Sequence, residues 1–141
     1  MATPRPDRAK SIPPTLGSQR ILLVEDDVAT LEAVRRLLTR RGHEVHVAES
    51  LAEARAVAGQ KEIDLVICDV GLPDGSGVDL MTELRTRFHL VGIALSALGE
   101  PEDLRRSREA GFVTHLVKPV SIGVLEQALL AATRAAPGGE G

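Results

Sequence analysis

Five short apolar segments alternate with amphipathic helical patterns along most of this chain of 141 residues, and this alternation restricts the fold more than any other feature. The segments span residues 21–24, 45–48, 65–68, 91–95 and 113–117. The third is continuously apolar, as expected of a strand that is covered on both faces. Strands that alternate with helices form parallel sheets with helices on both faces. We therefore expect an α/β, doubly wound, flavodoxin-like domain with five parallel strands in the order 2-1-3-4-5.

Helix signals lie between and after these segments. Apolar residues recur at helical spacing and predict buried helix faces, namely Val28, Leu31, Val34 and Leu38, then Val78, Met81 and Leu84, and finally Leu125, Ala128 and Leu129. Ser50 and Glu53 match a capping box, and Ser121 can cap the last helix. Pro101, followed by two acidic residues, predicts the first turn of another helix. That helix has little apolar face, so we expect it to be exposed and mobile. Residues 71–77 are predicted to form a loop.

The length allows one domain, which we place at residues 20–134. Residues 1–19 hold four of the eight prolines and almost no apolar periodicity, and residues 135–141 are rich in glycine. Both ends are therefore predicted to be disordered, the first as a tail or linker and the second as a tail.

Composition excludes several classes of function. The formal net charge is −3 and aromatic residues make up 1%, which disfavours nucleic acid as a partner. There is no apolar leader, and no apolar run is long enough to cross a bilayer, so we expect a cytoplasmic protein without membrane insertion. The single cysteine, Cys68, excludes an internal disulfide and is expected to be a buried small apolar residue.

Polar residues stand where the predicted strands end. Glu25 and Asp26 follow the first strand, Asp69 the third, Ser96 the fourth and Lys118 the fifth. The carboxyl edge of an open α/β sheet is where ligands bind, and the order 2-1-3-4-5 makes strands one and three neighbours. Three crowded carboxylates need a counter-charge, and Mg²⁺ suits oxygen ligands. Lys118 and Asp69 would lie two strand spacings apart, or roughly 10 Å. The long side chain of Lys118 can cover much of that distance.

These residues suit chemistry on phosphorus. A carboxylate can attack phosphorus and form an aspartyl phosphate. Such a transfer depends on neutralising charge on the phosphoryl oxygens more than on a strong base. A metal ion, the ammonium of Lys118 and the hydroxyl of Ser96 can supply that neutralisation together.

The same segments resemble response-regulator receiver domains of two-component and phosphorelay signalling. The resemblance rests on the acidic pair in ILLVEDD, the aspartate in DLVICDVGLPDGSG, Ser-Ala after IAL, and Lys-Pro in HLVKPV. It covers residues 20 to 134 and is specific because the four motifs occur in the right order at strand ends.

The resemblance implies a role for each site residue. Asp69 would be the phospho-acceptor; Asp26 would bind Mg²⁺ directly, Glu25 directly or through water, and Gly71 through its backbone carbonyl. Ser96 would bond to the phosphoryl group and Lys118 would pair with it. The Lys118–Pro119 peptide bond would be cis. His115 stands at the family's switch position, which commonly holds Tyr or Phe, so this chain departs from the usual aromatic switch.

The resemblance also implies partners and regulation. The phosphodonor would be a histidine kinase or a histidine phosphotransfer protein, and phosphorylation would switch a protein-interaction surface. The domain would not be an enzyme beyond supporting its own phosphorylation and autodephosphorylation. Three contexts stay open: a stand-alone regulator, a phosphorelay intermediate, and the receiver of a hybrid histidine kinase.

Other functional classes fit the motifs less well. Haloacid-dehalogenase-like phosphatases carry the nucleophile in Asp-x-Asp on the first strand, whereas here the acidic pair comes first and Asp69 is followed by Gly71 two residues on. A receiver that binds partners without phosphorylation would not need the complete set of site residues. Gly75-Ser76-Gly77 is not the elbow of a serine hydrolase. His43 and His46 have no third ligand nearby, so we expect solvated side chains there.

Overall fold

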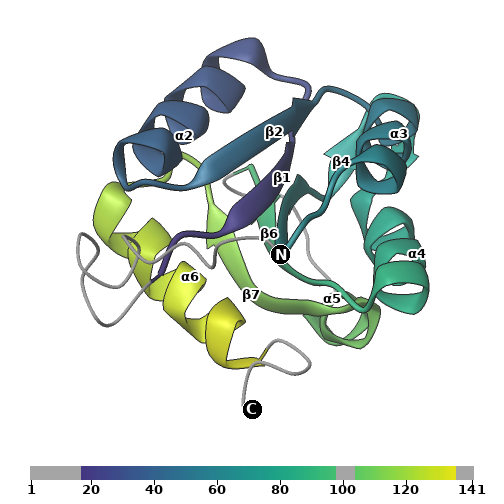
Figure 1. Ribbon diagram of the computed structural model, residues 1–141. Coiled ribbons are helices and arrows are strands. Elements are labelled where there is room, and N and C mark those ends of the chain that lie inside the picture. Colours follow the sequence, from purple (N-terminus) through teal and green to yellow (C-terminus); the bar gives the residue numbers. More distant parts are fainter. Residues whose placement is uncertain (1–16, 98–103, 136–141) are drawn as a thin grey trace.

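Within residues 17–97 and 104–135, which the computed structural model describes, five parallel strands form one sheet (Figure 1). The strands are β1 (Arg20–Val24), β2 (Glu44–Ala48), β3 (Leu65–Asp69), β6 (Val91–Ser96) and β7 (Phe112–Val117). Their spatial order is β2-β1-β3-β6-β7, with every neighbouring pair parallel. Since β6 and β7 are the fourth and fifth strands expected from the sequence, the predicted order 2-1-3-4-5 is confirmed.

Helices cover both faces of this sheet (Figure 1). One face is covered by α2 (Val28–Arg40) and α6 (Ile122–Ala135), and the other by α3 (Leu51–Gln60), α4 (Gly77–Phe88) and α5 (Leu104–Ala110). The salt bridge between Arg41 Nε and Glu126 Oε2, at 2.6 Å, joins the end of α2 to α6. None of the described helices is long and apolar enough to cross a membrane.

Two apolar cores result from the alternation of side chains along each strand. In β1, Ile21 and Leu23 pack with α2 and α6, whereas Leu22 and Val24 pack with α3 and α4. Every residue of β3 is buried, as its continuously apolar sequence predicts. The two cores hold the strands rigidly, so the strand ends can present side chains at defined positions.

Local capping follows the sequence closely at α3. Ser50 Oγ accepts the N–H of Glu53 at 3.1 Å, as the predicted capping box requires. In a standard capping box the Glu53 carboxylate would accept the N–H of Ser50. Here it accepts the N–H of the preceding residue, Glu49, at 2.8 Å. The predicted cap Ser121 accepts the N–H of Val124 at 3.3 Å.

Three expectations from the sequence are wrong in detail. Val28 lies on the exposed side of α2 with 58% of its surface accessible, because it is the first residue of the helix and points away from the sheet. The predicted loop 71–77 contains a short antiparallel ladder between β4 (Gly71–Leu72) and β5 (Gly75–Ser76). His43 is buried rather than solvated, because the segment just before β1 packs on it; its Nδ1 accepts the N–H of Gln19 at 3.0 Å.

Other expectations fall outside the described residues: the disorder of residues 1–16 and 136–141, and the helical turn at Pro101. Leu104 and Arg105 are exposed on α5, as its weak apolar pattern predicts, while Ser107 and Ala110 are buried.

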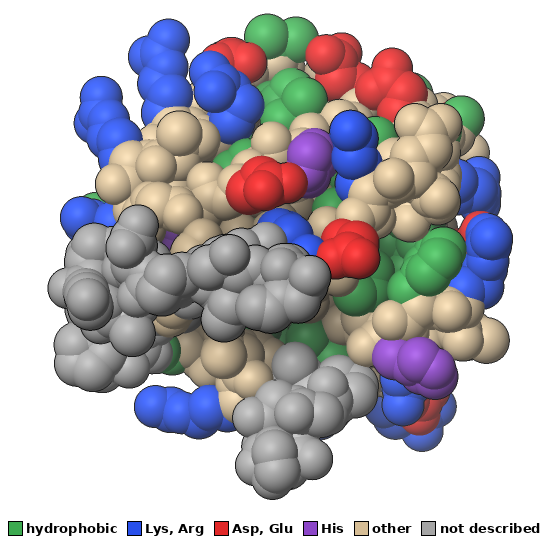
Figure 2. All heavy atoms as spheres, in the orientation of Figure 1, with side chains coloured by type: hydrophobic (Ala, Val, Ile, Leu, Met, Phe, Trp, Pro, Cys, Tyr) green, Lys and Arg blue, Asp and Glu red, His purple; other side chains and the backbone are tan. Residues whose placement is uncertain are grey.

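Figure 2 shows basic side chains gathered over α2, whose sequence includes Arg35, Arg36 and Arg40, with acidic side chains elsewhere on the same face. The exposed charge of that face is therefore of mixed sign.

Candidate functional site

Three carboxylates gather where β1 and β3 end. Glu25 and Asp26 follow the last residue of β1, and Asp69 is the last residue of β3, the neighbouring strand. One ligand oxygen of each lies within 4.8 Å of the other two. Glu25 and Asp69 are buried and Asp26 is exposed. The sheet order thus brings together residues that lie more than 40 positions apart in the chain.

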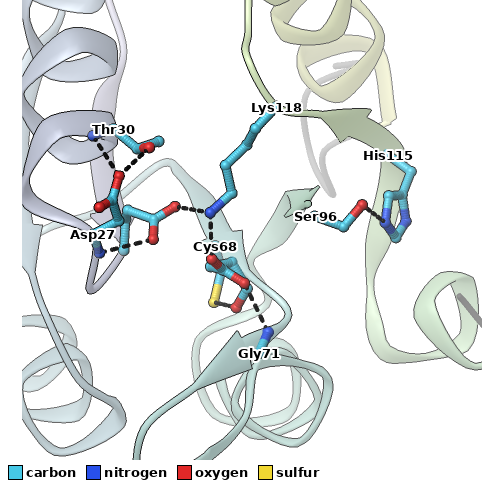
Figure 3. A network of polar contacts seen from close by, with 9 residues as sticks. Asp27, Thr30, Cys68, Gly71, Ser96, His115 and Lys118 are labelled. Atoms are coloured by element: carbon cyan, nitrogen blue, oxygen red, sulfur yellow. Dashed lines mark hydrogen bonds and ion pairs between the residues drawn. The ribbon is translucent and has the colours of Figure 1, made fainter. Parts of the chain in front are cut away.

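Lys118, the residue directly after β7, reaches this cluster across the intervening strand β6. Its Nζ donates to Glu25 Oε1 at 2.7 Å and to Asp69 Oδ2 at 2.6 Å (Figure 3). The backbone N–H of Lys118 donates to Ser96 O at 2.9 Å, which places the start of the side chain beside the end of β6. The peptide bond between Lys118 and Pro119 is cis.

The burial of these charges has electrostatic consequences. Burial raises the pKa of Glu25 to about 6, although its bond with Lys118 and the N–H of Asp27 oppose the rise. Burial alone would lower the pKa of Lys118, but its bonds with Asp69 and Glu25 raise it overall. Lys118 therefore remains an ammonium, and Glu25 is easier to protonate than an ordinary glutamate.

The segment after Asp69 is held tightly against β3. Asp69 Oδ1 accepts the N–H of Gly71 at 2.8 Å, and Gly77 N donates to Val70 O at 2.8 Å. A Cβ atom at Gly77 would stand 2.3 Å from the carbonyl oxygen of Asp69 and 3.0 Å from Cys68 Sγ. Only glycine lets the first turn of α4 approach β3 this closely.

The three carboxylates fit a hard divalent cation. Mg²⁺ prefers oxygen ligands and binds through a few carboxylates while keeping several waters. Asp26 is exposed and so leaves an open side for water or substrate oxygens, whereas Glu25 and Asp69 are buried. The Gly71 carbonyl follows two residues after Asp69, at the start of β4. These residues could hold such an ion together.

Ser96 and His115 face each other on the other side of Lys118 (Figure 3). Ser96 is fully buried at the end of β6, and its Oγ lies 3.2 Å from Nε2 of His115 on β7. His115 also lines a cavity of about 210 Å³ beside α5, together with Leu104 and Arg108. The imidazole therefore lies between the buried hydroxyl of Ser96 and α5.

Two further residues complete the surroundings of the site. Cys68 is buried as expected; its Sγ donates to the carbonyl oxygen of Asp69 at 3.1 Å, and burial raises the pKa of its thiol. Asp74, which the sequence reasoning missed, binds the start of α3 through both carboxylate oxygens. The turn signal in Pro73-Asp74-Gly75 marks such a residue, but no local pattern reveals its distant partner.

Comparisons with known proteins agree with this geometry. The family model described as the response regulator receiver domain matches residues 21–130. The KDP operon transcriptional regulatory protein KdpE of Escherichia coli K12 is 37% identical over 114 residues, which cover 81% of this chain and 51% of KdpE. This chain thus spans about half the length of that relative.

A second relative and a solved structure extend the comparison. The sensor histidine kinase AruS of Pseudomonas aeruginosa is 32% identical over 120 residues, which cover 82% of this chain and 12% of AruS. The crystal structure of a response regulator receiver domain protein from Clostridium thermocellum superposes with a TM-score of 0.73 at 30% identity. That match covers 82% of this chain and 95% of the other.

Proposed function

The chain belongs to the response regulator receiver domains of two-component signalling, and on this premise we propose that Asp69 accepts a phosphoryl group from a phosphohistidine. The observation that carries the proposal is the position of Lys118 Nζ, which lies within hydrogen-bonding distance of both Asp69 and Glu25. A cation at this position can neutralise charge on a phosphoryl group attached to Asp69.

In the proposed transfer, a carboxylate oxygen of Asp69 attacks phosphorus as the nucleophile. A P–O bond forms to Asp69 while the P–N bond to the donor imidazole breaks, and the leaving nitrogen keeps the electron pair of that bond. The product is an acyl phosphate, which brings new negative charge and acceptor oxygens to the carboxyl edge of the sheet. Ser96 and Lys118 would donate hydrogen bonds to these oxygens.

We further propose that Glu25, Asp26, Asp69 and the Gly71 carbonyl hold Mg²⁺. When bound, the ion would neutralise charge on the phosphoryl oxygens and hold them in place for the transfer. The support is the clustering of three carboxylate oxygens within 4.8 Å and the accessibility of Asp26. Among residues 17–97 and 104–135, Lys118 is the cation whose side chain bonds to this acidic cluster, and it faces more than one carboxylate.

The donor in this proposal is a histidine kinase or a histidine phosphotransfer protein. The similarity to AruS, a sensor histidine kinase, supports a kinase system as the source of the phosphoryl group. Val28, Val117 and Val124 are exposed apolar residues at the start of α2, the end of β7 and the first turn of α6. All three elements meet the carboxyl edge of the sheet, so a protein donor could pack there beside Asp69.

The domain is a signalling module, and its own chemistry in this proposal is limited to gaining and losing the phosphoryl group. The loss would be hydrolysis of the acyl phosphate by water. A cytoplasmic location follows from a kinase donor of this kind and belongs to the same proposal.

Intact mass after incubation with acetyl phosphate and Mg²⁺ tests the proposal directly. The wild-type chain should gain one phosphoryl group, and chelation of Mg²⁺ should prevent the gain. Asp69→Asn should gain none, whereas Asp79→Asn, which removes an exposed carboxylate on α4, should behave as wild type. Equal labelling of wild type and Asp69→Asn would overturn the assignment of the acceptor. No labelling of wild type, from acetyl phosphate or from a phosphohistidine protein, would favour a receiver that acts without phosphorylation.

A further inference from the structure

We propose that Asp74 is a positioning residue, which holds residues 70–76 against α3 and thereby fixes the Gly71 carbonyl where it can bind Mg²⁺. The inference deepens the proposed function and rests on it. Asp74 itself is exposed and touches none of the reacting groups. Its effect would pass through the short hairpin that carries Gly71.

The contact between Asp74 and α3 is bidentate. Asp74 Oδ1 accepts the N–H of Leu51 at 2.9 Å, and Oδ2 accepts the N–H of Ala52 at 3.2 Å. These bonds, led by the one from Leu51, lower the pKa of Asp74, so the carboxylate stays ionised. The partners lie 22 and 23 residues earlier in the chain, so the contact ties two separate segments together.

The local caps of α3 leave these two amides to Asp74. Ser50 Oγ accepts the N–H of Glu53, and the Glu53 carboxylate accepts the N–H of Glu49. A helix start has several N–H groups without partners inside the helix. Asp74 therefore adds a tether from another segment to a start that its own residues already cap.

Packing reinforces the tether. A Cβ atom at Gly75 would stand 2.7 Å from Leu51 Cδ1, and the φ of Gly75 is +147°. Leu51 is buried, and Leu72 packs against the same core. The hairpin that follows the acceptor is thus pressed against the first residue of α3 directly beside the Asp74 contact.

The Asp74 contact completes a ring of contacts that runs from Asp69 through the hairpin, α3 and the end of β2 to Glu25. Asp69 Oδ1 holds the N–H of Gly71, and Gly71 pairs with Ser76 across the hairpin. On the other side, α3 follows β2, and the carbonyl of Ala48 at the end of β2 accepts the N–H of Glu25 at 3.0 Å. Loss of the Asp74 contact would break this ring of contacts and let the Gly71 carbonyl move relative to Glu25.

The test compares Asp74→Ala and Asp74→Asn with a control, Ser50→Ala, which removes a cap from the same helix start without touching the hairpin. Mg²⁺ affinity is measured by calorimetric titration of the 141-residue chain, and stability by urea denaturation. Hydrogen exchange of the Gly71 amide is followed by NMR in Mg²⁺-free buffer.

Asp74→Ala should weaken Mg²⁺ binding about tenfold, in the range found for residues that orient metal ligands, and should speed exchange at Gly71. Asp74→Asn should retain most of the affinity, because one side-chain oxygen can still accept the N–H of Leu51. Ser50→Ala should lower stability and leave Mg²⁺ affinity and Gly71 exchange unchanged.

Each contrary result overturns the inference in a recognisable way. Equal loss of affinity in Asp74→Ala and Ser50→Ala would mean that only helix stability matters. Equal loss in Asp74→Asn and Asp74→Ala would mean that the negative charge acts, not the tether. Unchanged affinity in Asp74→Ala beside a wild type that binds Mg²⁺ would overturn the inference alone. A wild type that binds no Mg²⁺ would overturn the metal site of the proposed function as well.

Discussion

The Nζ atom of Lys118 lies 2.6 Å from Oδ2 of Asp69, although the two residues are 49 positions apart and their strands are separated by β6. The extended lysine side chain spans that strand and ends between Asp69 and Glu25, so one ammonium balances two buried carboxylates. Removal of this cation would leave like charges together in a place with little water.

Lys118→Met should lower the free energy of unfolding by about 3 kcal/mol, because it leaves an uncompensated pair of buried carboxylates. Added Mg²⁺ should restore part of the loss, since it supplies positive charge to the folded state alone. Urea denaturation with and without Mg²⁺ measures both effects. Lys61→Met, at an exposed lysine after α3, is the matched control and should change little. A Lys118→Met protein as stable as wild type would contradict the role of this ammonium.

Glu25 gives the domain a defined dependence on pH. Its pKa in the folded chain is about 6, above its ordinary value of 4.5, so the protonated form is favoured by folding. The contribution of protonated Glu25 to the free energy of unfolding is fully present below pH 4.5. It is lost as pH rises through 6, which lowers the free energy of unfolding by about 2 kcal/mol. Glu25→Gln stays neutral throughout, so wild type should lose stability relative to this variant between pH 4.5 and 7. Parallel stability curves, from urea denaturation in Mg²⁺-free buffer, would contradict the raised pKa.

Mg²⁺ should raise the melting temperature of the wild-type chain, because it relieves repulsion among Glu25, Asp26 and Asp69 and binds the folded state alone. Asp26→Asn should abolish the rise, since the exposed carboxylate is lost without disturbing the core. Thermal melts at increasing Mg²⁺ measure the effect, and Asp79→Asn serves as the control. A melt of wild type that does not respond to Mg²⁺ would count against the metal site.

Gly77 lets α4 start against β3. Gly77→Ala should destabilise the domain by about 3 kcal/mol, because the new methyl group meets the backbone at Asp69 as well as Cys68 Sγ. Gly59→Ala, at a helical glycine of α3 with open space around it, should stabilise the domain slightly. Urea denaturation separates the two, and equal effects would show that the close approach is unimportant.

Ser96 and His115 should act together after phosphorylation. A movement of the Ser96 hydroxyl toward the phosphoryl group would lengthen its 3.2 Å contact with the imidazole, and His115 could then shift beside α5. NMR shifts at β7 and α5 on phosphorylation should therefore be large in wild type and reduced in Ser96→Ala and His115→Ala. Identical shifts in all three proteins would refute the coupling and leave Asp69 as the proposed acceptor.

The site residues could be predicted from the sequence because each follows an apolar segment. The positions of Glu25, Asp69 and Lys118 at strand ends, together with the preference for right-handed crossovers, imply one shared edge. Their roles came from the resemblance to receiver domains and not from periodicity. Mutual distances, the contact of Ser96 with His115 and the elevated pKa of Glu25 could not be predicted, since they depend on packing in three dimensions.

Local periodicity and capping signals determined the five strands of the main sheet and the helices that alternate with them, because backbone geometry and burial act on neighbouring residues. Only the tertiary structure decided which polar groups meet. His43 is buried because the chain before β1 passes over it, and Asp74 binds α3 because the hairpin packs on Leu51. Lys118 ends between two carboxylates because the sheet order brings the end of β7 near the ends of β3 and β1. Such contacts join segments 22 to 93 residues apart, and their geometry arises only when the whole core has packed.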